Sequence, residues 1–321
     1  MKPLPRWFRC AAGLLALVSW GSTLAGTAPA PQFVSAKPVW PEGREREKNL
    51  FVGFRASFTA PAGQKVWLRA TGATLYRVFL NGQFLGHGPA RGPHGFYRVD
   101  EWDLTGQLRS GANLIAFEVA GYNANSYYVL DQPSFLQAEV VAGADVLAST
   151  GGAGSAFVAA VLRERVQKVQ RYSFQRPFSE VYRLQPGYDR WRTDASAPLA
   201  TVPCAVQEKK ALLARGVACA DFTVRQPSWR VSRGEVETGV KVDNPWKDRS
   251  LTGVGPKLGG YPENELATIP TLELQTVRNR TRTPIDQPYA PDQPIRLKAG
   301  TYEIVDFGCN LTGFVGTKLQ C

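Results

Sequence analysis

Short segments of alternating apolar and polar residues, separated by glycine, asparagine and proline, constrain the fold of this chain more than any other feature. In FVGFRASF, residues 51–58, every second side chain is apolar: Val52, Phe54, Ala56 and Phe58. Such alternation is typical of a half-buried strand, and KVWLRAT, LYRVFLNGQFLGHG and NLIAFEVAGY repeat it. At least six strands are expected between Phe51 and Val141. No helical crossover of about ten residues separates them, which predicts an antiparallel β-sandwich or barrel.

The Asn81-Gly82 pair lies between two of these segments and predicts a type I′ hairpin turn, because both residues tolerate positive φ. The next glycines follow the spacing G-x-G-x-x-x-G, one residue longer than the dinucleotide-binding fingerprint. That fingerprint also requires a helix to begin at its end. Pro89 and Pro93 prevent a helix there, so a nucleotide-binding loop is excluded.

The first 25 residues have the pattern of a secretory signal peptide, with a basic start, an apolar run over 11–20 and small residues at 23 and 25. We expect cleavage after Ala25 and a periplasmic or extracellular protein. No later segment supplies the roughly 20 apolar residues of a membrane-spanning helix. Residues 26–39, rich in alanine, proline and threonine, are interpreted as a leader into the first domain.

The rest of the chain is interpreted as two β-domains, a sandwich over 40–200 and a linker with a second, incomplete β-sandwich over 201–321. Further strands are expected in TLELQTV, PIRLKAG, TYEIVDFG and FVGTKLQ, residues 271–277, 294–300, 301–308 and 314–320. Residues 156–170 also fit a helical stripe, and 205–215 are interpreted as a second short helix ending before Gly216. The fold class is therefore all-β, with at most two short helices.

Four cysteines remain after the signal peptide: Cys204, Cys219, Cys309 and Cys321. An even number in an exported protein predicts disulfides, and we expect the local pairs Cys204–Cys219 and Cys309–Cys321, although four cysteines permit three connectivities. The C-x₂-C spacing of a zinc site is missing. His87 and His94 are the only histidines, with no acidic residue between them, and they favour surface or hydrogen-bonding roles over a metal site.

The chain is basic, and losing Lys2, Arg6 and Arg9 with the signal lowers its formal net charge from +11 to +8. Its lysines and arginines are scattered among strand-like segments, which favours a solvated surface over a nucleic-acid partner. A serine-hydrolase triad is disfavoured by the two histidines and by the lack of a G-x-S-x-G elbow.

The order of these motifs resembles the galactose-binding-like, jelly-roll β-sandwich at the N-terminus of bacterial α-L-rhamnosidases of glycoside hydrolase family 78. The residues that carry the resemblance lie in LYRVFLNGQFLGHGPARG and FYRVDEWDLTGQLRSGANLIAFEVAGYN: Asn81, Gly82, Gly86, Gly88, Pro89, Asp100, Asp103, Leu104, Thr105, Leu108, Gly111 and Asn113. RYSFQRPFSEVYRL and YEIVDFGCNLTGFVGTKL look like later segments of the same proteins. These marks are first of all turn residues: Asp103 and Thr105 suit the end of a strand, and Gly111 suits positive φ.

The resemblance implies inverting hydrolysis of terminal α-L-rhamnosides by two carboxylates on an (α/α)₆ barrel. Such a barrel needs twelve helices, and this chain shows no helical repeat. We therefore expect either a truncated gene product or a fragment whose catalytic domain is encoded downstream, with no catalytic residue in this chain and no hydrolysis by it alone.

The alternative is a free-standing carbohydrate-binding module, and a purely structural adaptor for a barrel is a third reading. Sugars bind to aromatic faces, with polar groups fixing their orientation. GYNANSYY, residues 121–128, supplies candidate sugar contacts: Tyr122, Asn123, Asn125, Tyr127 and Tyr128. Some rhamnose-binding modules of this fold use calcium, and the oxygen donors for it would be Asn123, Asn125 and Asp131. No other cofactor is expected.

Overall fold

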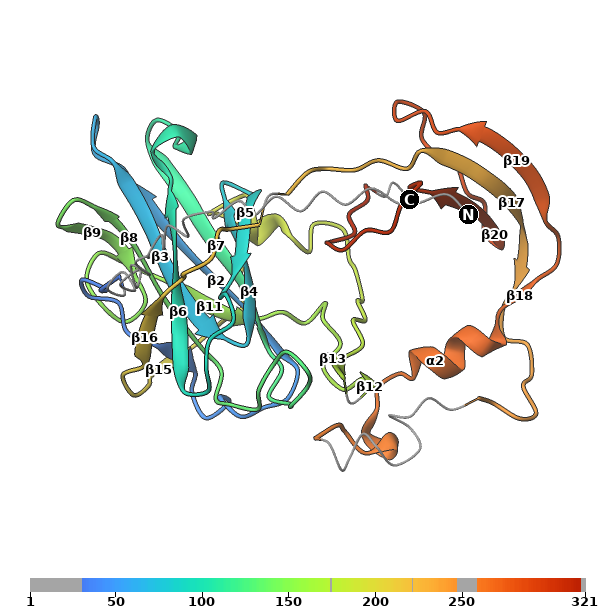
Figure 1. Ribbon diagram of the computed structural model, residues 1–321, viewed down its shortest axis with the longest axis horizontal. Helices are drawn as coiled ribbons and strands as arrows, with labels where there is room; N and C mark the ends of the chain where they lie inside the picture. The colour runs from blue at the N-terminus through green and yellow to red at the C-terminus, as the bar shows by residue number, and fades with distance from the viewer. Residues whose placement is uncertain (1–30, 174, 221, 247–258, 319–321) are drawn as a thin grey trace, which may run out of the picture.

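The computed structural model describes residues 31–173, 175–220, 222–246 and 259–318. Two sheets packed face to face form a β-sandwich, and a separate four-stranded sheet follows it in the chain (Figure 1). The strands pair antiparallel, except for two edge pairs in the first sheet. The all-β prediction is confirmed.

The first sheet of the sandwich has the order β10-β9-β8-β3-β6-β16, with β1 pairing to both β8 and β15. Its strands are β1 (Val39–Pro41), β3 (Val66–Ala73), β6 (Phe96–Asp103), β8 (Phe135–Ala142), β9 (Asp145–Ser149), β10 (Ser155–Ala156), β15 (Cys204–Val206) and β16 (Ala211–Ala214). The second sheet has the order β14-β11-β2-β7-β4-β5. Its strands are β2 (Leu50–Thr59), β4 (Leu75–Leu80), β5 (Gln83–Gly88), β7 (Ala112–Gly121), β11 (Val158–Val161) and β14 (Thr201–Val202).

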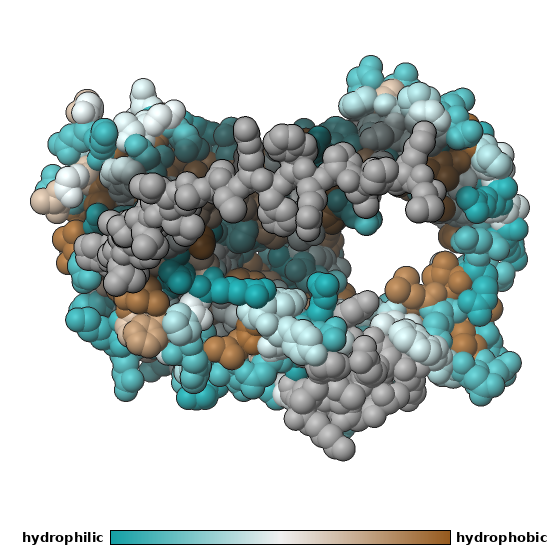
Figure 2. Space-filling view, in the orientation of Figure 1, coloured by the Kyte–Doolittle hydropathy of each residue, from teal (hydrophilic) through white to brown (hydrophobic). Residues whose placement is uncertain are grey.

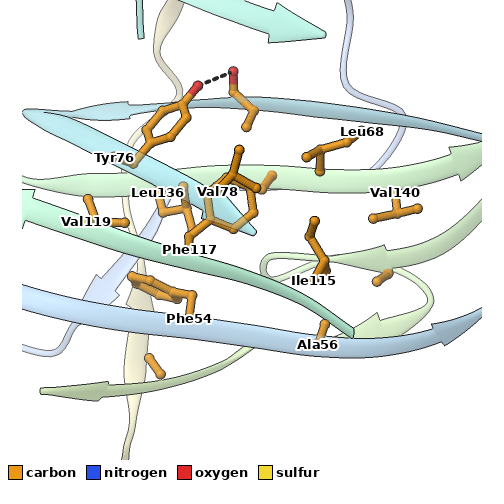
Figure 3. Packing of buried hydrophobic residues seen from close by; sticks show 14 of the residues in the cluster. Phe54, Ala56, Leu68, Tyr76, Val78, Ile115, Phe117, Val119, Leu136 and Val140 are labelled. Carbon is orange, nitrogen blue, oxygen red and sulfur yellow. Dashed lines mark hydrogen bonds between the residues drawn. The ribbon is translucent and has the colours of Figure 1, made fainter. Parts of the chain in front are cut away.

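The core lies between these two sheets. The alternating face of β2 points into it, with Val52, Phe54, Ala56 and Phe58 at most 4 % exposed, as predicted from their period of two. Phe54 belongs to one apolar cluster with Val78, Ile115 and Phe117 from the same sheet and Leu68 and Leu136 from the opposite one (Figure 3). Burial of large apolar side chains from both sheets is the main stabilising contribution to the sandwich.

The predicted hairpin turn is confirmed. Asn81 and Gly82 have φ values of 52° and 82°, and Leu80 pairs with Gln83 across the two-residue turn. The Asn81 side chain also receives the backbone N–H of Leu114 at 2.9 Å, which fixes the turn to β7. At the end of β6, the backbone N–H of Thr105 donates to the Asp103 carboxylate at 2.9 Å, as expected for these turn residues.

The inner end of β5 approaches a buried polar cluster. Asp100, fully buried on β6, contacts the Tyr76 hydroxyl and forms an ion pair with Arg215. Burial raises the pKa of the Asp100 carboxyl, while Tyr76 and Arg215 act in the opposite direction. A Cβ atom at Gly88 would lie 1.7 Å from the Asp100 carboxylate, so the position requires glycine.

The segment after β11 covers the outer face of the second sheet. It carries β12 (Arg171–Ser173), β13 (Arg176–Phe178) and the short helix η2 (Arg190–Arg192), and its Leu162 and Trp191 pack with Phe51 and Phe79. Glu118 on this face is contacted by Arg77, by Arg192 at 2.8 Å and by Arg165 at 3.9 Å. This buried ion network fixes the covering segment to the sheet.

The sandwich extends beyond the predicted boundaries at both ends. The leader expected over 26–39 is partly strand: β1 begins at Val39, and the Glu139 carboxylate accepts backbone N–H groups of Val34, Ser35 and Ala36 at 2.9–3.2 Å. Strands after residue 200 also join the two sheets of the sandwich, since β14, β15 and β16 pair with β11, β1 and β6. The helix predicted over 205–215 is wrong for the same reason. Residues 156–170 hold β11 rather than a helix.

The second region is one sheet rather than a two-layer sandwich within the described residues. It contains β17 (Trp229–Glu237), β18 (Arg278–Asn279), β19 (Thr283–Pro288) and β20 (Thr301–Asp306), and the last of these was predicted. Between them lie η4 (Glu263–Glu265), α2 (Pro270–Glu273) and η5 (Leu274–Thr276). The strands predicted over 271–277 and 294–300 are wrong, and 314–318 are also irregular. Figure 2 shows an open space between the sandwich and this sheet.

The predicted Cys204–Cys219 disulfide is not formed, and both residues are exposed free thiols. Cys204 lies on β15 opposite Pro41, whereas Cys219 lies in the irregular segment after β16, which pairs with β6. Cys309 is also a free thiol, and its expected partner Cys321 lies outside the described residues. Among the described residues, no helix has the length and apolar character needed to cross a bilayer.

Candidate functional site

Two loops meet at one end of the sandwich, the lower end in Figure 1. One loop, residues 89–95, joins β5 to β6, and the other, residues 122–134, joins β7 to β8. Strand register brings them together, because β4 pairs Tyr76 with Gly88 on one side and Leu75 with Ala120 on the other. The glycine- and proline-rich stretch and the tyrosine-rich stretch noted in the sequence therefore form one surface.

A cavity of about 270 Å³ lies between these loops and is called the loop cavity below. Four aromatic residues line it: Phe96, Tyr97, Tyr127 and Tyr128. Tyr127 is 69 % exposed and Phe96 is 47 % exposed, so both rings are open to solvent. Exposed aromatic rings beside a cavity are the surface that stacks on the CH groups of a sugar ring.

The polar groups of the loop cavity are held by the fold. Arg98 donates from Nε to the Arg91 carbonyl at 2.6 Å and from Nη1 to the carbonyls of Ala214 and Arg215 at 2.8 and 2.9 Å. The Tyr97 hydroxyl donates to the Gln132 side chain at 3.3 Å, and burial raises the pKa of Tyr97. These contacts tie the two loops to β16 and leave the cavity largely preformed.

Arg91 lies against the loop formed by residues 122–134, which is called the tyrosine loop below. Its guanidinium carbon lies 5.5 Å from the ring centre of Tyr128, within the range of a cation–π contact. Such a contact orients a long and otherwise mobile side chain. The Arg91 charge is therefore presented at the edge of an aromatic wall.

A second cavity, of about 440 Å³, lies on the other side of Tyr128. It is lined by Tyr122, Tyr128, Arg176, Pro177, Phe178, Ser179 and Glu180. Glu180 forms an ion pair with Arg165 at 2.9 Å and accepts a hydrogen bond from the Tyr182 hydroxyl at 3.0 Å. Tyr128 is the one residue common to both cavities.

The structure separates the predicted sugar contacts into two groups. Tyr127 and Tyr128 line the loop cavity. Tyr122 is 8 % exposed and packs against Phe51 on the outer face of the second sheet. Burial raises the pKa of Tyr122. Asn123, 2 % exposed, donates to the carbonyls of Glu45 and Glu47, and like Asn125 it lines neither cavity.

The oxygen donors proposed for calcium are engaged within the loop. The Asn123 side-chain oxygen accepts from the Ser134 hydroxyl at 3.3 Å, and that of Asn125 accepts from the backbone N–H of Asp131 at 2.9 Å. Among the described residues, no group of three or more His, Cys, Asp or Glu side chains could hold a metal ion. His87 packs against the rings of Phe222 and Phe314, whereas His94 is exposed. Calcium dependence stays a prediction.

The lining residues that were not predicted from the sequence include Arg91, Phe96, Tyr97, Arg98 and Gln132. Four of these five lie in RGPHGFYR, a stretch from which no ligand contact was predicted. The combination of arginine with paired aromatic residues directly after a proline-rich loop is the signal that could have found them.

The comparisons with known proteins agree with the architecture. No family model and no curated protein matches the chain. Among solved structures, a family 78 rhamnosidase of Bacillus sp. GL1 matches with 24 % identity and a TM-score of 0.55, over 63 % of this chain and 22 % of that one. This chain has the fold of part of a family 78 rhamnosidase. The resemblance found in the sequence is therefore confirmed at the level of the fold.

Two further structures match more weakly. An α-L-rhamnosidase from Aspergillus terreus has 12 % identity and a TM-score of 0.43, over 84 % of this chain and 36 % of that one. A Pleurotus ostreatus lectin in complex with GalNAc has 14 % identity and a TM-score of 0.34, over 65 % of this chain and 58 % of the lectin. The chain spans about a fifth of the length of the Bacillus rhamnosidase and about a third of the Aspergillus one.

Proposed function

We propose that this chain is the non-catalytic, carbohydrate-binding β-sandwich region of an exported α-L-rhamnosidase-like glycoside hydrolase. The observation that carries this proposal is the loop cavity, lined by four aromatic residues at the loop end of the sandwich. The exposed rings of Tyr127 and Phe96 suit stacking on a sugar, and Arg91 and Gln132 suit its hydroxyl groups. A volume of about 270 Å³ suits one or two sugar rings.

The acidic residues at the cavities support a binding role rather than hydrolysis. An inverting glycosidase needs two carboxyl groups about 6.5–9.5 Å apart around the scissile bond. Among the described residues, none of those that line the loop cavity is Asp or Glu, and the second cavity has Glu180 alone. We therefore assign no catalytic residue, and hydrolysis of terminal α-L-rhamnosides would belong to an (α/α)₆ domain acting together with this one.

A free-standing carbohydrate-binding protein is the second candidate, and the same cavity supports it. In both candidate functions the sandwich binds carbohydrate. They differ in whether a catalytic domain accompanies it. Restoring rhamnosidase activity by adding a separately produced barrel domain would favour the first candidate.

Calorimetric titration with L-rhamnose and rhamnose-containing oligosaccharides tests the proposal. We expect heat of binding, loss of it in Tyr127→Ala, and no hydrolysis of an aryl α-L-rhamnoside. Tyr188→Ala is the matched control, since this exposed tyrosine lines neither cavity. Repeating the titration with a chelator tests calcium dependence. If neither neutral nor acidic sugars give heat of binding, the binding proposal is contradicted. Turnover of the aryl α-L-rhamnoside contradicts the non-catalytic role.

A further inference from the structure

The loop cavity has an unbalanced charge. It is lined by Arg91 and Arg98 and, among the described residues, by no Asp or Glu. Neither arginine forms an ion pair within the described part of the chain, whereas Arg77 is paired with Glu118 and Arg215 with Asp100. A positive charge beside a cavity without a protein carboxylate attracts an anionic group from a ligand.

Arg98 contributes a fixed charge. Three hydrogen bonds to carbonyls hold its guanidinium in place, and carbonyls do not neutralise the charge. Its position is therefore set by the strands and not by a ligand. This residue biases the cavity toward anions without any rearrangement on binding.

Arg91 contributes an accessible charge. It is exposed, and its contact with the Tyr128 ring leaves its N–H groups available for a bidentate contact with a carboxylate. The aromatic wall and the guanidinium thus present an apolar face and an anion-binding group side by side.

A uronic acid combines the two features that this surface complements, since it has a CH face for the rings and a carboxylate for arginine. A neutral sugar has only the CH face. The second cavity carries the Glu180 carboxylate, which repels an anion, so the preference should be confined to the loop cavity.

We infer that the saccharide bound in the loop cavity carries a carboxylate, and that Arg91 is the residue that recognises it. This inference rests on the proposed function, because it takes the loop cavity to be a sugar site. It narrows the ligand from carbohydrate in general to acidic, uronate-containing saccharides.

Two matched pairs of probes test it: methyl galactoside with its uronate, and polygalacturonate with its fully methyl-esterified form. At low ionic strength we expect the acidic member of each pair to bind about tenfold to a hundredfold more tightly, the range for a charge-assisted hydrogen bond. Added salt should reduce the difference. Arg91→Gln should remove most of it and leave only the small part due to the fixed charge of Arg98, and Arg91→Lys should retain an intermediate preference.

Arg109→Gln is the control, because this exposed arginine lies outside both cavities and its removal lowers the net charge equally. It should leave the preference unchanged. Equal binding of the acidic and neutral members, or a preference that Arg109→Gln abolishes as fully as Arg91→Gln does, overturns the inference while leaving the proposed function intact. Binding of neither member, nor of any neutral sugar, overturns both. Circular dichroism of each variant confirms that the fold is retained.

Discussion

The sandwich and the four-stranded sheet of this chain are built from similar strands but are stabilised differently. In the sandwich, every residue of β8 is buried, and so are nine of the ten residues of β7. In the four-stranded sheet, Ser232 is the only buried residue of the four strands. Burial on both faces distinguishes the first region, and exposed faces distinguish the second.

The difference shows what each region depends on. The sandwich gains stability from apolar area removed from water on both sides of its second sheet. The four-stranded sheet depends more on its backbone ladder and on contacts such as the bidentate ion pair of Arg230 with Glu303, at 2.5 and 2.9 Å. Trp229 and Ile304 remain about 40 % exposed there. We therefore expect the four-stranded sheet to unfold at lower denaturant than the sandwich.

Truncating one apolar side chain in each region tests this contrast. Phe117→Ala removes a fully buried ring at the centre of the sandwich and should lower its free energy of unfolding by about 3–5 kcal/mol. Ile304→Ala in β20 should cost less than about 1 kcal/mol. Guanidinium denaturation followed by circular dichroism measures both values. Equal costs would contradict the contrast.

Alanine substitutions at two glycines test how closely the sandwich is packed. Gly88→Ala places a Cβ atom 1.7 Å from the Asp100 carboxylate and 2.7 Å from the Tyr76 hydroxyl, and it should destabilise the sandwich by about 1–3 kcal/mol. At Gly106 an added Cβ meets nothing within 4 Å, so Gly106→Ala should change little. Thermal unfolding midpoints compare the two variants. If Gly88→Ala melts with the parent protein, the close approach at Asp100 is not a constraint.

The smallest expected effect concerns pH, and it should occur in the sandwich alone, because both histidines of the chain lie there. Burial, followed by the charge of Arg215, lowers the pKa of His87 below its ordinary value of 6.5. The folded protein therefore favours neutral His87. The resulting stability is present above about pH 6.5 and is lost as the pH falls through the lowered pKa.

Denaturation of the sandwich at pH 5, 6 and 7 should show this loss, and His87→Asn should reduce it. His94→Asn is the control, because this exposed histidine makes no ring contact with the aromatic residues that surround His87. A pH profile that His87→Asn leaves unchanged would rule out His87 as the cause. The transition of the four-stranded sheet should not follow this profile.

The same contrast explains how much could be predicted from the sequence. In the sandwich, alternation placed Val52, Phe54 and Phe58 on the correct face, because the second half of β2 is buried on one face only and so has a clear period of two. The Asn-Gly pair predicted the turn. In the second region, TLELQTV became α2 and η5. Both faces there are largely exposed, so a short apolar run carries little information about its structure.

The site was predicted in part for a related reason. The tyrosine loop was found from its composition, and Tyr127 and Tyr128 do line the loop cavity. Arg91, Phe96 and Gln132 were missed because they come from a loop about 30 residues earlier or from the far end of the same loop. Only the strand register places these loops together, and single-sequence patterns do not contain it. The disulfide predicted between Cys204 and Cys219 was wrong for the same reason, because single-sequence patterns do not contain the strand register.

The Glu139 carboxylate, fully buried and bound to three successive backbone N–H groups, sets a limit on shortening this polypeptide from its front. A version that starts at Pro31 keeps all three donors. A version that starts after Ala36 leaves this buried carboxylate without its three N–H donors, with Arg69 still 3.6 Å away. The six residues 31–36 thus decide whether the first edge of the sandwich is stable in a shortened protein.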